Sequence, residues 1–138
     1  MIIGIGIDIC ELARFEAAEQ RRPGFARRWL TETEAGLSLA SRAGRFAAKE
    51  ALAKALLAEG GLGWHDVWVV NDEFGRPALE VTGTVLARAR QLGVDALHLS
   101  ISHDGGLASA VVVAEHTGTG PLLDAGTANA GTGTEDPR

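Results

Sequence analysis

Residues 45–56 constrain the fold more than any other part of this 138-residue chain. The segment consists almost entirely of Ala, Leu, Lys, Glu and Arg, so it predicts a helix. At about 100° per residue, Glu50 lies between Phe46 and Lys54, and no clean polar face stands opposite an apolar one. The pattern predicts a largely buried helix, in which a carboxylate needs a metal, a cationic side chain or a ligand as its partner.

The remaining patterns indicate an α+β domain with a mainly antiparallel sheet. Residues 2–9 alternate as a strand, with isoleucines on one face, and 12–35 predict two or three short helices, the last capped by Thr31 with Glu34 at its third position. The long helix is expected to start after Gly44. Strands are expected at 64–70, 77–81, 96–102 and 107–114, with a helix after the cap residue Thr82 and a turn at 103–106.

The chain divides into two parts by composition. Residues 1–116 carry the periodic patterns and predict one domain. Residues 117–138 are rich in Gly, Thr, Ala and Asp with few apolar anchors, so we expect a disordered tail that carries no fold information.

Charge is unevenly distributed along the chain. The formal net charge is −5, yet residues 14–54 hold nine of the thirteen basic residues. Two interpretations stay open: a solvated helical face, or a docking patch for an acidic partner. An acidic chain without tyrosine disfavours nucleic acid as that partner. Five arginines lie close together in sequence: Arg14, Arg21, Arg22, Arg27 and Arg28.

Several classes of protein are disfavoured by composition. Cys10 is the only cysteine, so one chain can form neither a disulfide framework nor a zinc cluster of cysteines. The N-terminal apolar run is short, interrupted by glycine and contains Asp8, unlike a signal peptide. No stretch approaches the ~20 apolar residues of a membrane span, so we expect no membrane association and a cytoplasmic location.

Asp8 is the first candidate functional residue. It shares a strand face with Gly4 and Gly6, and paired glycines in a strand indicate that something approaches the backbone closely. Asp8 can cap the following helix or bind a hard cation. The glycines do not complete a dinucleotide-binding motif, because Ile9 stands where the third glycine belongs.

Glu50 is the second candidate. It can form an ordinary i,i+4 ion pair with Lys54, or it can join Asp8 in holding Mg²⁺, which proteins commonly bind through one or two carboxylates plus substrate phosphate. In that case Arg45, Lys49 and Lys54 can neutralise phosphate oxygens. Composition and spacing alone lead only to a phosphate-handling metal site.

His103 and Asp104 follow an alternating strand. Simple turn chemistry before two glycines explains Asp104, and an exposed hydrogen-bonding side chain explains His103. The functional alternative is a contact to a phosphate or base at the end of the sheet. A serine hydrolase fits poorly, because Ser100 and Ser102 lie in a predicted strand without a Gly-x-Ser-x-Gly elbow.

Four segments together resemble the holo-acyl-carrier-protein synthases, the small bacterial 4′-phosphopantetheinyl transferases. They are residues 4–15, which end in the Arg14-Phe15 pair, 45–54 with its Lys-Glu-Ala core, 75–83 with Gly-Arg-Pro, and 98–103. The first two are specific, and the last two are weak alone. The resemblance spans about residues 2–115 and implies a mainly antiparallel sheet wrapped around a long helix, with subunits that pack as a homotrimer.

The resemblance also implies an activity. Coenzyme A donates its 4′-phosphopantetheine group to a serine of apo acyl carrier protein, in support of fatty acid biosynthesis, and adenosine 3′,5′-bisphosphate leaves. Mg²⁺ is implied as the metal, with Asp8 and Glu50 as its ligands; with Lys54 these two form the implied catalytic set. The general base stays open between a metal-bound water, Glu50 and a carboxylate of the carrier protein. The implied coenzyme-binding residues are Arg45, Lys54, Arg76, Pro77, Ser102 and His103.

The same resemblance gives the arginine cluster a purpose, because carrier proteins are acidic. The candidates for docking the carrier protein are Arg14, Arg21, Arg22 and Arg28. Active sites are implied to lie between subunits of the trimer. The stretch 36–44 departs from the family pattern in length, and the tail has no recognised counterpart.

Two rival hypotheses remain at this point. One is a non-enzymatic module on the same scaffold that binds carrier protein or nucleotide; it can lose either carboxylate, so the presence of both Asp8 and Glu50 favours the enzyme. The other is an unrelated Mg²⁺-dependent phosphohydrolase, which is expected to carry more than two acidic ligands.

Overall fold

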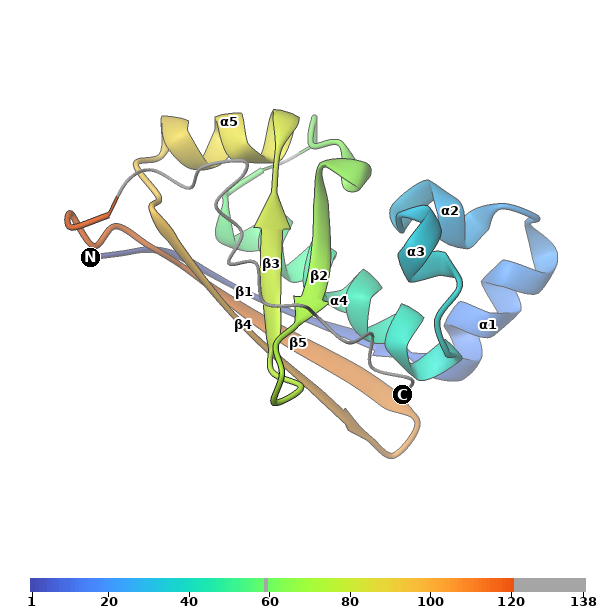
Figure 1. Ribbon diagram of the computed structural model, residues 1–138. Coiled ribbons are helices and arrows are strands. Elements are labelled where there is room, and N and C mark those ends of the chain that lie inside the picture. Colours follow the sequence, from blue (N-terminus) through green and yellow to red (C-terminus); the bar gives the residue numbers. More distant parts are fainter. Residues whose placement is uncertain (59, 121–138) are drawn as a thin grey trace.

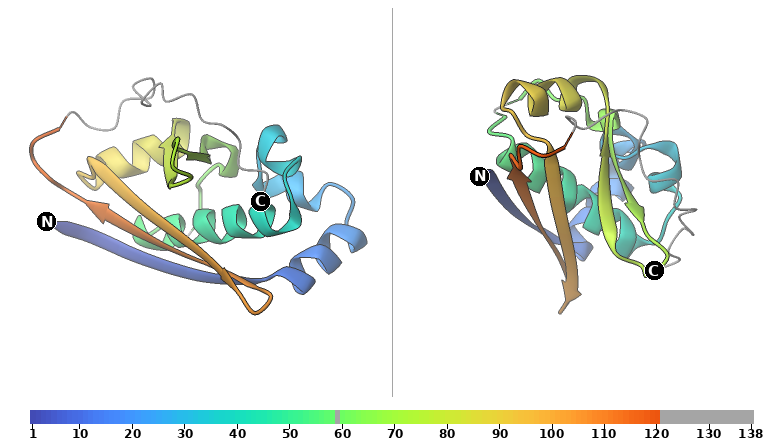
Figure 2. Two further views of the ribbon diagram at one scale, coloured as in Figure 1. Left: turned by 60° about the horizontal axis from the view of Figure 1, so that its bottom comes forward. Right: turned by 60° about the vertical axis from the view of Figure 1, so that its left-hand side comes forward.

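A long helix lies between two antiparallel β-sheets in the computed structural model, which describes residues 1–58 and 60–120 (Figure 1). Helix α4 (Leu39–Ala55) packs on a three-stranded sheet with the order β1 (Ile2–Glu11), β5 (Leu107–Glu115), β4 (Ala96–Asp104). The hairpin of β2 (Val67–Asn71) and β3 (Pro77–Val81) lies on the other side of α4, as Figure 2 shows. The expected α+β architecture, with a mainly antiparallel sheet around a long helix, is confirmed.

Short helices cover the two ends of α4. At its N-terminal end lie α1 (Leu12–Arg21), α2 (Phe25–Trp29) and α3 (Glu32–Ala35), and α5 (Gly83–Gln91) lies at the other end (Figure 1). Thr31 and Glu34 form a reciprocal capping box at the start of α3, as the sequence predicts. The shared core consists mainly of alanines of α4 and β5, valines of β2, and leucines.

The backbones of β1 and α4 are in direct contact. A Cβ atom added to Gly4 would lie 1.9 Å from the carbonyl oxygen of Ala55, and one added to Gly6 would lie 1.8 Å from that of Ala51. The close approach predicted from this pair of glycines is therefore the approach of a helix, which only residues without a side chain allow.

Helix α4 begins earlier than predicted. Its N-cap is Ser38, whose side chain accepts a hydrogen bond from the Ser41 N–H at 3.2 Å, so Gly44 lies inside the helix. A Cβ atom at Gly44 would lie 3.0 Å from Nε2 of His103. Gly44 is thus a packing position against β4, where the sequence pattern indicated a helix boundary.

Three further boundaries differ from the prediction. Residues Trp64–Asp66 form a 3₁₀ turn, η1, before β2 begins, instead of the start of a strand. The side chain of Asp66 accepts the N–H of Thr84 at 2.8 Å and so caps α5, whereas Thr82 makes no side-chain cap bond. Strand β4 extends to Asp104, so only Gly105 and Gly106 remain as the turn, both with positive φ.

The outer face of the three-stranded sheet is apolar along β1. Ile5, Ile7 and Ile9 are 64%, 58% and 62% exposed, and Val113 and Val111 lie opposite Ile5 and Ile7 on β5. Contiguous exposed apolar surface of this kind commonly marks an interaction site.

The first residues of the expected tail are hydrogen-bonded to the domain. Within the expected tail, the N–H groups of Thr117 and Gly118 donate to the carboxylate of Asp95 at 2.7 and 3.0 Å. The predicted disorder of 121–138 falls outside the described residues, and the division at 116 stays a prediction. Across residues 1–58 and 60–120, no helix combines the length and apolar character that crossing a bilayer requires.

Candidate active site

Asp8 and Glu50 come together where β1 meets α4. The strand turns Asp8 toward α4, on the face that carries Gly4 and Gly6, and Asp8 is not a helix cap, since the N-cap of α1 is Glu11. Burial raises the pKa of Glu50, and the negative charge of Asp8 raises it further, while Lys54 lowers it. The structure therefore brings two mutually repelling carboxylates together in a partly desolvated place.

Lys54 pairs with Asp8 from the next turn of α4. Its Nζ donates to Oδ1 of Asp8 at 3.2 Å and to the carbonyl oxygen of Ile7 at 2.8 Å. For the part of the chain that the structure describes, Asp8 is the only ion-pair partner of Lys54, so the i,i+4 pair with Glu50 does not form. The Lys54 side chain is 54% exposed and accessible to a ligand.

The protein supplies these two carboxylates without a third metal-ligating side chain. Among residues 1–58 and 60–120, no group of three or more His, Cys, Asp or Glu side chains is arranged to hold a metal ion. Two carboxylates with open positions fit Mg²⁺, which retains waters and takes further oxygens from phosphate. They do not fit a closed structural metal site.

Cys10 lies near Asp8, and its thiol is unreactive. Burial raises the pKa of its thiol to about 11; the charge of Asp8 adds to the effect, and Arg14 opposes it. The thiol is thus protonated at neutral pH and is a poor nucleophile.

A cleft of about 560 Å³ lies on the other flank of α4. Nε2 of His103 on β4 makes a hydrogen bond with the carbonyl oxygen of Ala40 at 2.8 Å, which fixes the ring at the cleft wall. Arg45, 7% exposed, and Pro77 also line it. The structure therefore brings together three of the predicted coenzyme-binding residues from α4, β3 and β4. The complete lining is Ala40, Ser41, Gly44, Arg45, Asn71, Gly75, Pro77, Ile101 and His103.

Two predicted coenzyme-binding residues lie outside this cleft. The guanidinium of Arg76 pairs with Asp72 at 2.8 Å and lies 5.2 Å from the ring centroid of Phe74, with the side chain 74% exposed. Ser102 is exposed beside His103 on β4, and because side chains alternate along a strand, it faces the outer side of the sheet.

The carboxylate pair and the cleft lie on opposite flanks of α4. Five residues separate Arg45 from Glu50, which is about 140° of rotation around the helix. The C-terminal half of α4 packs on β1, which is one edge of the sheet, while Gly44 packs on β4, which is the other edge. Within one chain, α4 stands between the carboxylate pair and the cleft that Arg45 and His103 line.

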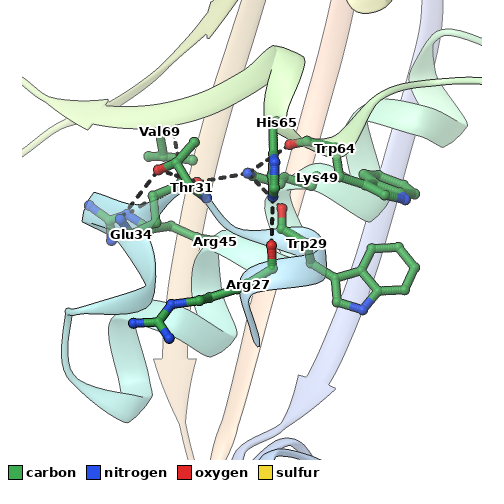
Figure 3. A network of polar contacts seen from close by, with 9 residues as sticks. All are labelled: Arg27, Trp29, Thr31, Glu34, Arg45, Lys49, Trp64, His65 and Val69. Atoms are coloured by element: carbon green, nitrogen blue, oxygen red, sulfur yellow. Dashed lines mark hydrogen bonds and ion pairs between the residues drawn. The ribbon is translucent and has the colours of Figure 1, made fainter. Parts of the chain in front are cut away.

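A buried charge network on this second flank is the feature that sequence reasoning missed (Figure 3). Nζ of Lys49 donates to Oε1 of Glu34 at 2.7 Å, to the carbonyl oxygen of Trp29 at 2.8 Å and to that of Trp64 at 3.0 Å. Lys49 is 0% exposed, so it cannot reach the phosphates to which it was assigned. Burial lowers its pKa, and Glu34 opposes that shift. The capping signal at Thr31 located Glu34, but no local pattern connects it with Lys49.

A second cavity of about 480 Å³ adjoins the network. It shares Arg45 and Asn71 with the cleft, so the Arg45 side chain borders both spaces. Its other lining residues are Thr31, Thr33, Glu34, Leu37, His65, Trp68, Val69 and Val70.

The candidate docking arginines are exposed on α1, α2 and the turn between them. Arg14, Arg21, Arg22 and Arg28 all lie at the surface, and Arg28 lies 5.7 Å from the ring centroid of Trp29. Arg27, which was not among the candidates, pairs with Glu32 at 3.1 Å. The four candidates are therefore accessible to a partner protein.

Known proteins share both the sequence and the fold of this chain. The family model of the 4′-phosphopantetheinyl transferase superfamily matches residues 4–112. A holo-[acyl-carrier-protein] synthase of Streptomyces avermitilis is 57% identical over 120 residues, covering 83% of this chain and 98% of its own.

Two solved structures of ligand complexes have the same fold. A holo-(acyl-carrier-protein) synthase from Bacillus anthracis in complex with CoA (3′,5′-ADP) is 40% identical, with a TM-score of 0.67 over 83% of this chain and 96% of its own. The Helicobacter pylori synthase in complex with coenzyme A is 34% identical, with a TM-score of 0.71 over 80% of this chain and 99% of its own. The segments around Asp8 and Glu50 thus lie inside a match that spans residues 4–112, and the chain belongs to the holo-[acyl-carrier-protein] synthases of the 4′-phosphopantetheinyl transferase superfamily.

Proposed function

We propose that this protein transfers the 4′-phosphopantetheine group of coenzyme A to a serine of apo acyl carrier protein, in support of fatty acid biosynthesis. The observation that carries the proposal is the convergence of Arg45, His103 and Pro77 on one cleft, together with the carboxylate pair that Asp8 of β1 forms with Glu50 of α4. Relatives that bind coenzyme A share the fold. A non-enzymatic binding module would have no need of the carboxylate pair.

The reaction is an in-line phosphoryl transfer. The serine oxygen of the carrier protein forms a bond to the phosphorus that bears the pantetheine arm, and the bond from that phosphorus to the bridging oxygen breaks. Adenosine 3′,5′-bisphosphate leaves, and the serine proton passes to a base. Catalysis of this kind depends on positioning and on stabilising charge around the diphosphate.

Asp8 and Glu50 are the residues that would hold Mg²⁺. Their mutual repulsion, seen in the raised pKa of Glu50, is relieved by a divalent cation, and their two carboxylates leave positions open for phosphate oxygens and water. When bound, Mg²⁺ supplies charge stabilisation on the diphosphate. Lys54, anchored on Asp8 yet half exposed, adds a positive charge beside the same oxygens.

The cleft would hold the nucleotide end of coenzyme A. Arg45 brings a guanidinium suited to bidentate contact with phosphate, and His103 presents an imidazole whose ring is fixed by Ala40. Pro77 provides an apolar wall. Arg76, at the exposed end of the β2–β3 loop, can reach the same ligand only by leaving Asp72.

A homotrimer accounts for the separation of the carboxylate pair from the cleft within one chain. The exposed isoleucine row of β1 is an apolar face that packing against a second copy would bury. If the cleft of one copy lies beside the carboxylates of its neighbour, each interface contains a complete site. Sedimentation is then expected to give three times the 14.4 kDa of one chain, and Ile7→Glu is expected to give monomers without activity.

Intact mass spectrometry of the carrier protein tests the activity. Incubation with coenzyme A and Mg²⁺ is expected to add one phosphopantetheine to apo acyl carrier protein, and an unchanged mass would remove the proposal. Asp8→Ala and Glu50→Ala are each expected to abolish the mass gain while thermal unfolding stays cooperative. Retained transfer in either variant would refute the metal assignment. Glu80→Ala, which removes a half-buried carboxylate on β3, serves as the matched control.

A further inference from the structure

The Glu34 carboxylate occupies the centre of the network in Figure 3 and is itself held rigidly. It is 3% exposed, and its Oε1 accepts from the N–H of Thr31 at 3.0 Å and from Nζ of Lys49 at 2.7 Å. Its Oε2 accepts from the N–H of Val69 at 3.1 Å and lies 3.9 Å from Nε of Arg45. The carboxylate is thus fixed by α3, α4 and β2 at once, and it presents one oxygen toward Arg45.

Lys49 and Arg45 lie at different distances from the Glu34 carboxylate. Lys49 makes the tight contact, and its three N–H groups are all used by Glu34 and two backbone carbonyls. Arg45 stands more than 1 Å farther from the carboxylate and borders the cleft. Glu34 is therefore neutralised mainly by Lys49 and only weakly by Arg45.

In this arrangement Glu34 can orient the guanidinium of Arg45 without neutralising its charge, which a simple Arg–Glu pair cannot do. A carboxylate bound closely by Arg45 alone would orient the guanidinium but cancel its charge. A carboxylate already neutralised by Lys49 can orient the guanidinium and leave a net positive charge of one on the three groups. Orientation by a buried, multiply anchored neighbour is the usual support of a precise binding residue.

We propose that Glu34 and Lys49 form a neutral buried pair whose task is to position Arg45 for a phosphate of the coenzyme. The proposal rests on the proposed function only for the identity of the ligand, a nucleotide that bears phosphate groups. Glu34 and Lys49 are positioning residues, since neither side chain is exposed to a ligand in the cleft.

Calorimetric titration with adenosine 3′,5′-bisphosphate tests this role. Glu34→Gln alone leaves Lys49 buried without its counter-charge and is expected to unfold the protein, so the informative variant is Glu34→Gln/Lys49→Met, which removes both charges together. We expect it to fold and to weaken binding about tenfold, as a charge-assisted contact loses its geometry. In enzymatic assays the loss should fall on the KM for coenzyme A rather than on kcat. Glu34→Asp, which keeps the charge but shortens its reach, should weaken binding about threefold.

A thermodynamic cycle distinguishes positioning from a purely structural role. Introduced into Arg45→Gln, the same double substitution should change the dissociation constant less than about twofold, because nothing remains to be positioned. Glu19→Gln is the matched control: it breaks the half-buried ion pair of Glu19 on α1 with Arg42 on α4, at 2.7 Å, neither of which lines the cleft, and it should leave binding unchanged.

Three results would overturn the proposal. They are wild-type affinity in a folded Glu34→Gln/Lys49→Met variant, wild-type affinity in Glu34→Asp, or an equal loss with and without Arg45. Failure of the proposed function looks different, because the wild-type protein itself would then bind no adenosine 3′,5′-bisphosphate.

Discussion

Replacement of Gly6 by alanine tests how tightly the fold couples the sheet to the catalytic helix. The added Cβ would lie 1.8 Å from the carbonyl oxygen of Ala51, where ordinary contact requires about 3.3 Å. The obstructing atoms belong to the helix backbone, so no side-chain rotation relieves the clash. Helix α4 must move by roughly 1.5 Å away from β1 to restore ordinary contact.

This displacement is expected to be costly because the moved face is buried. Ala47, Ala48, Ala51 and Ala55 are all 0% exposed, and their contacts with the sheet open together. Overpacking of a core costs about 1–3 kcal/mol, and we expect Gly6→Ala to reach at least the upper value because the clash is with backbone. The same movement separates Glu50 from Asp8, so activity should fall even where the protein remains folded.

Denaturant unfolding followed by tryptophan fluorescence measures the effect, at one fixed protein concentration because an oligomer's stability depends on it. Gly36→Ala is the matched control, since its Cβ would make only ordinary contacts, 3.6 Å to the carbonyl oxygen of Thr33 and 3.9 Å to that of Glu32, and its φ of −83° suits alanine. The control should stay within about 1 kcal/mol of the parent protein. Equal stability of Gly6→Ala and Gly36→Ala would refute the close packing of α4 on β1.

Three further predictions concern charge and reactivity. Arg14→Glu should raise the KM for acyl carrier protein at least about fivefold and leave coenzyme A binding intact, with the difference shrinking as salt is added; collapse of coenzyme A binding would refute the docking role. Cys10, with its pKa raised to about 11, should resist iodoacetamide in the folded protein at pH 7 and react on unfolding, and rapid labelling of the native protein would contradict its burial. Hydrogen bonds from the first turn of α5 lower the pKa of Asp66, so its contribution to stability is present above the ordinary carboxyl pKa of about 4 and is lost as the pH falls through the lower folded value. Asp66→Asn should therefore flatten the acid side of the stability profile, and an unchanged profile would exclude this cap.

Local patterns predicted most elements because local physics determines them. The alternation of 2–9, the Thr31 capping box and the hairpin turns act within a few residues, and all three appear in the structure. Gly44 was misread as a boundary, because its reason for being glycine is His103, which lies on a strand almost sixty residues later. Asp66 caps α5 from 18 residues before Thr84, which is farther than any local capping pattern reaches.

For the candidate site, too, local patterns predicted some residues correctly and missed those whose contacts lie far away in the sequence. Asp8 and Glu50 were predicted to meet, because a bare strand face and an awkward helical carboxylate each require a partner, and the structure brings them together. Lys49 was assigned to phosphate from its place on the helix, yet Glu34 holds it in the core. The assignments of Ser102 and Arg76 to the coenzyme stay predictions, and both residues lie outside the cleft in a single chain.

Mixing two inactive variants gives the most direct test of a transferase site shared between copies. One variant carries Glu50→Ala, and the other carries Arg45→Gln with His103→Ala. After unfolding and refolding as an equal mixture, a site with intact carboxylates from one copy and an intact cleft from another forms in about a quarter of interfaces. Intact mass of the carrier protein should therefore show phosphopantetheine transfer at about a quarter of the wild-type rate, whereas no recovery in a mixture that sediments as trimers would show that each site lies within a single chain.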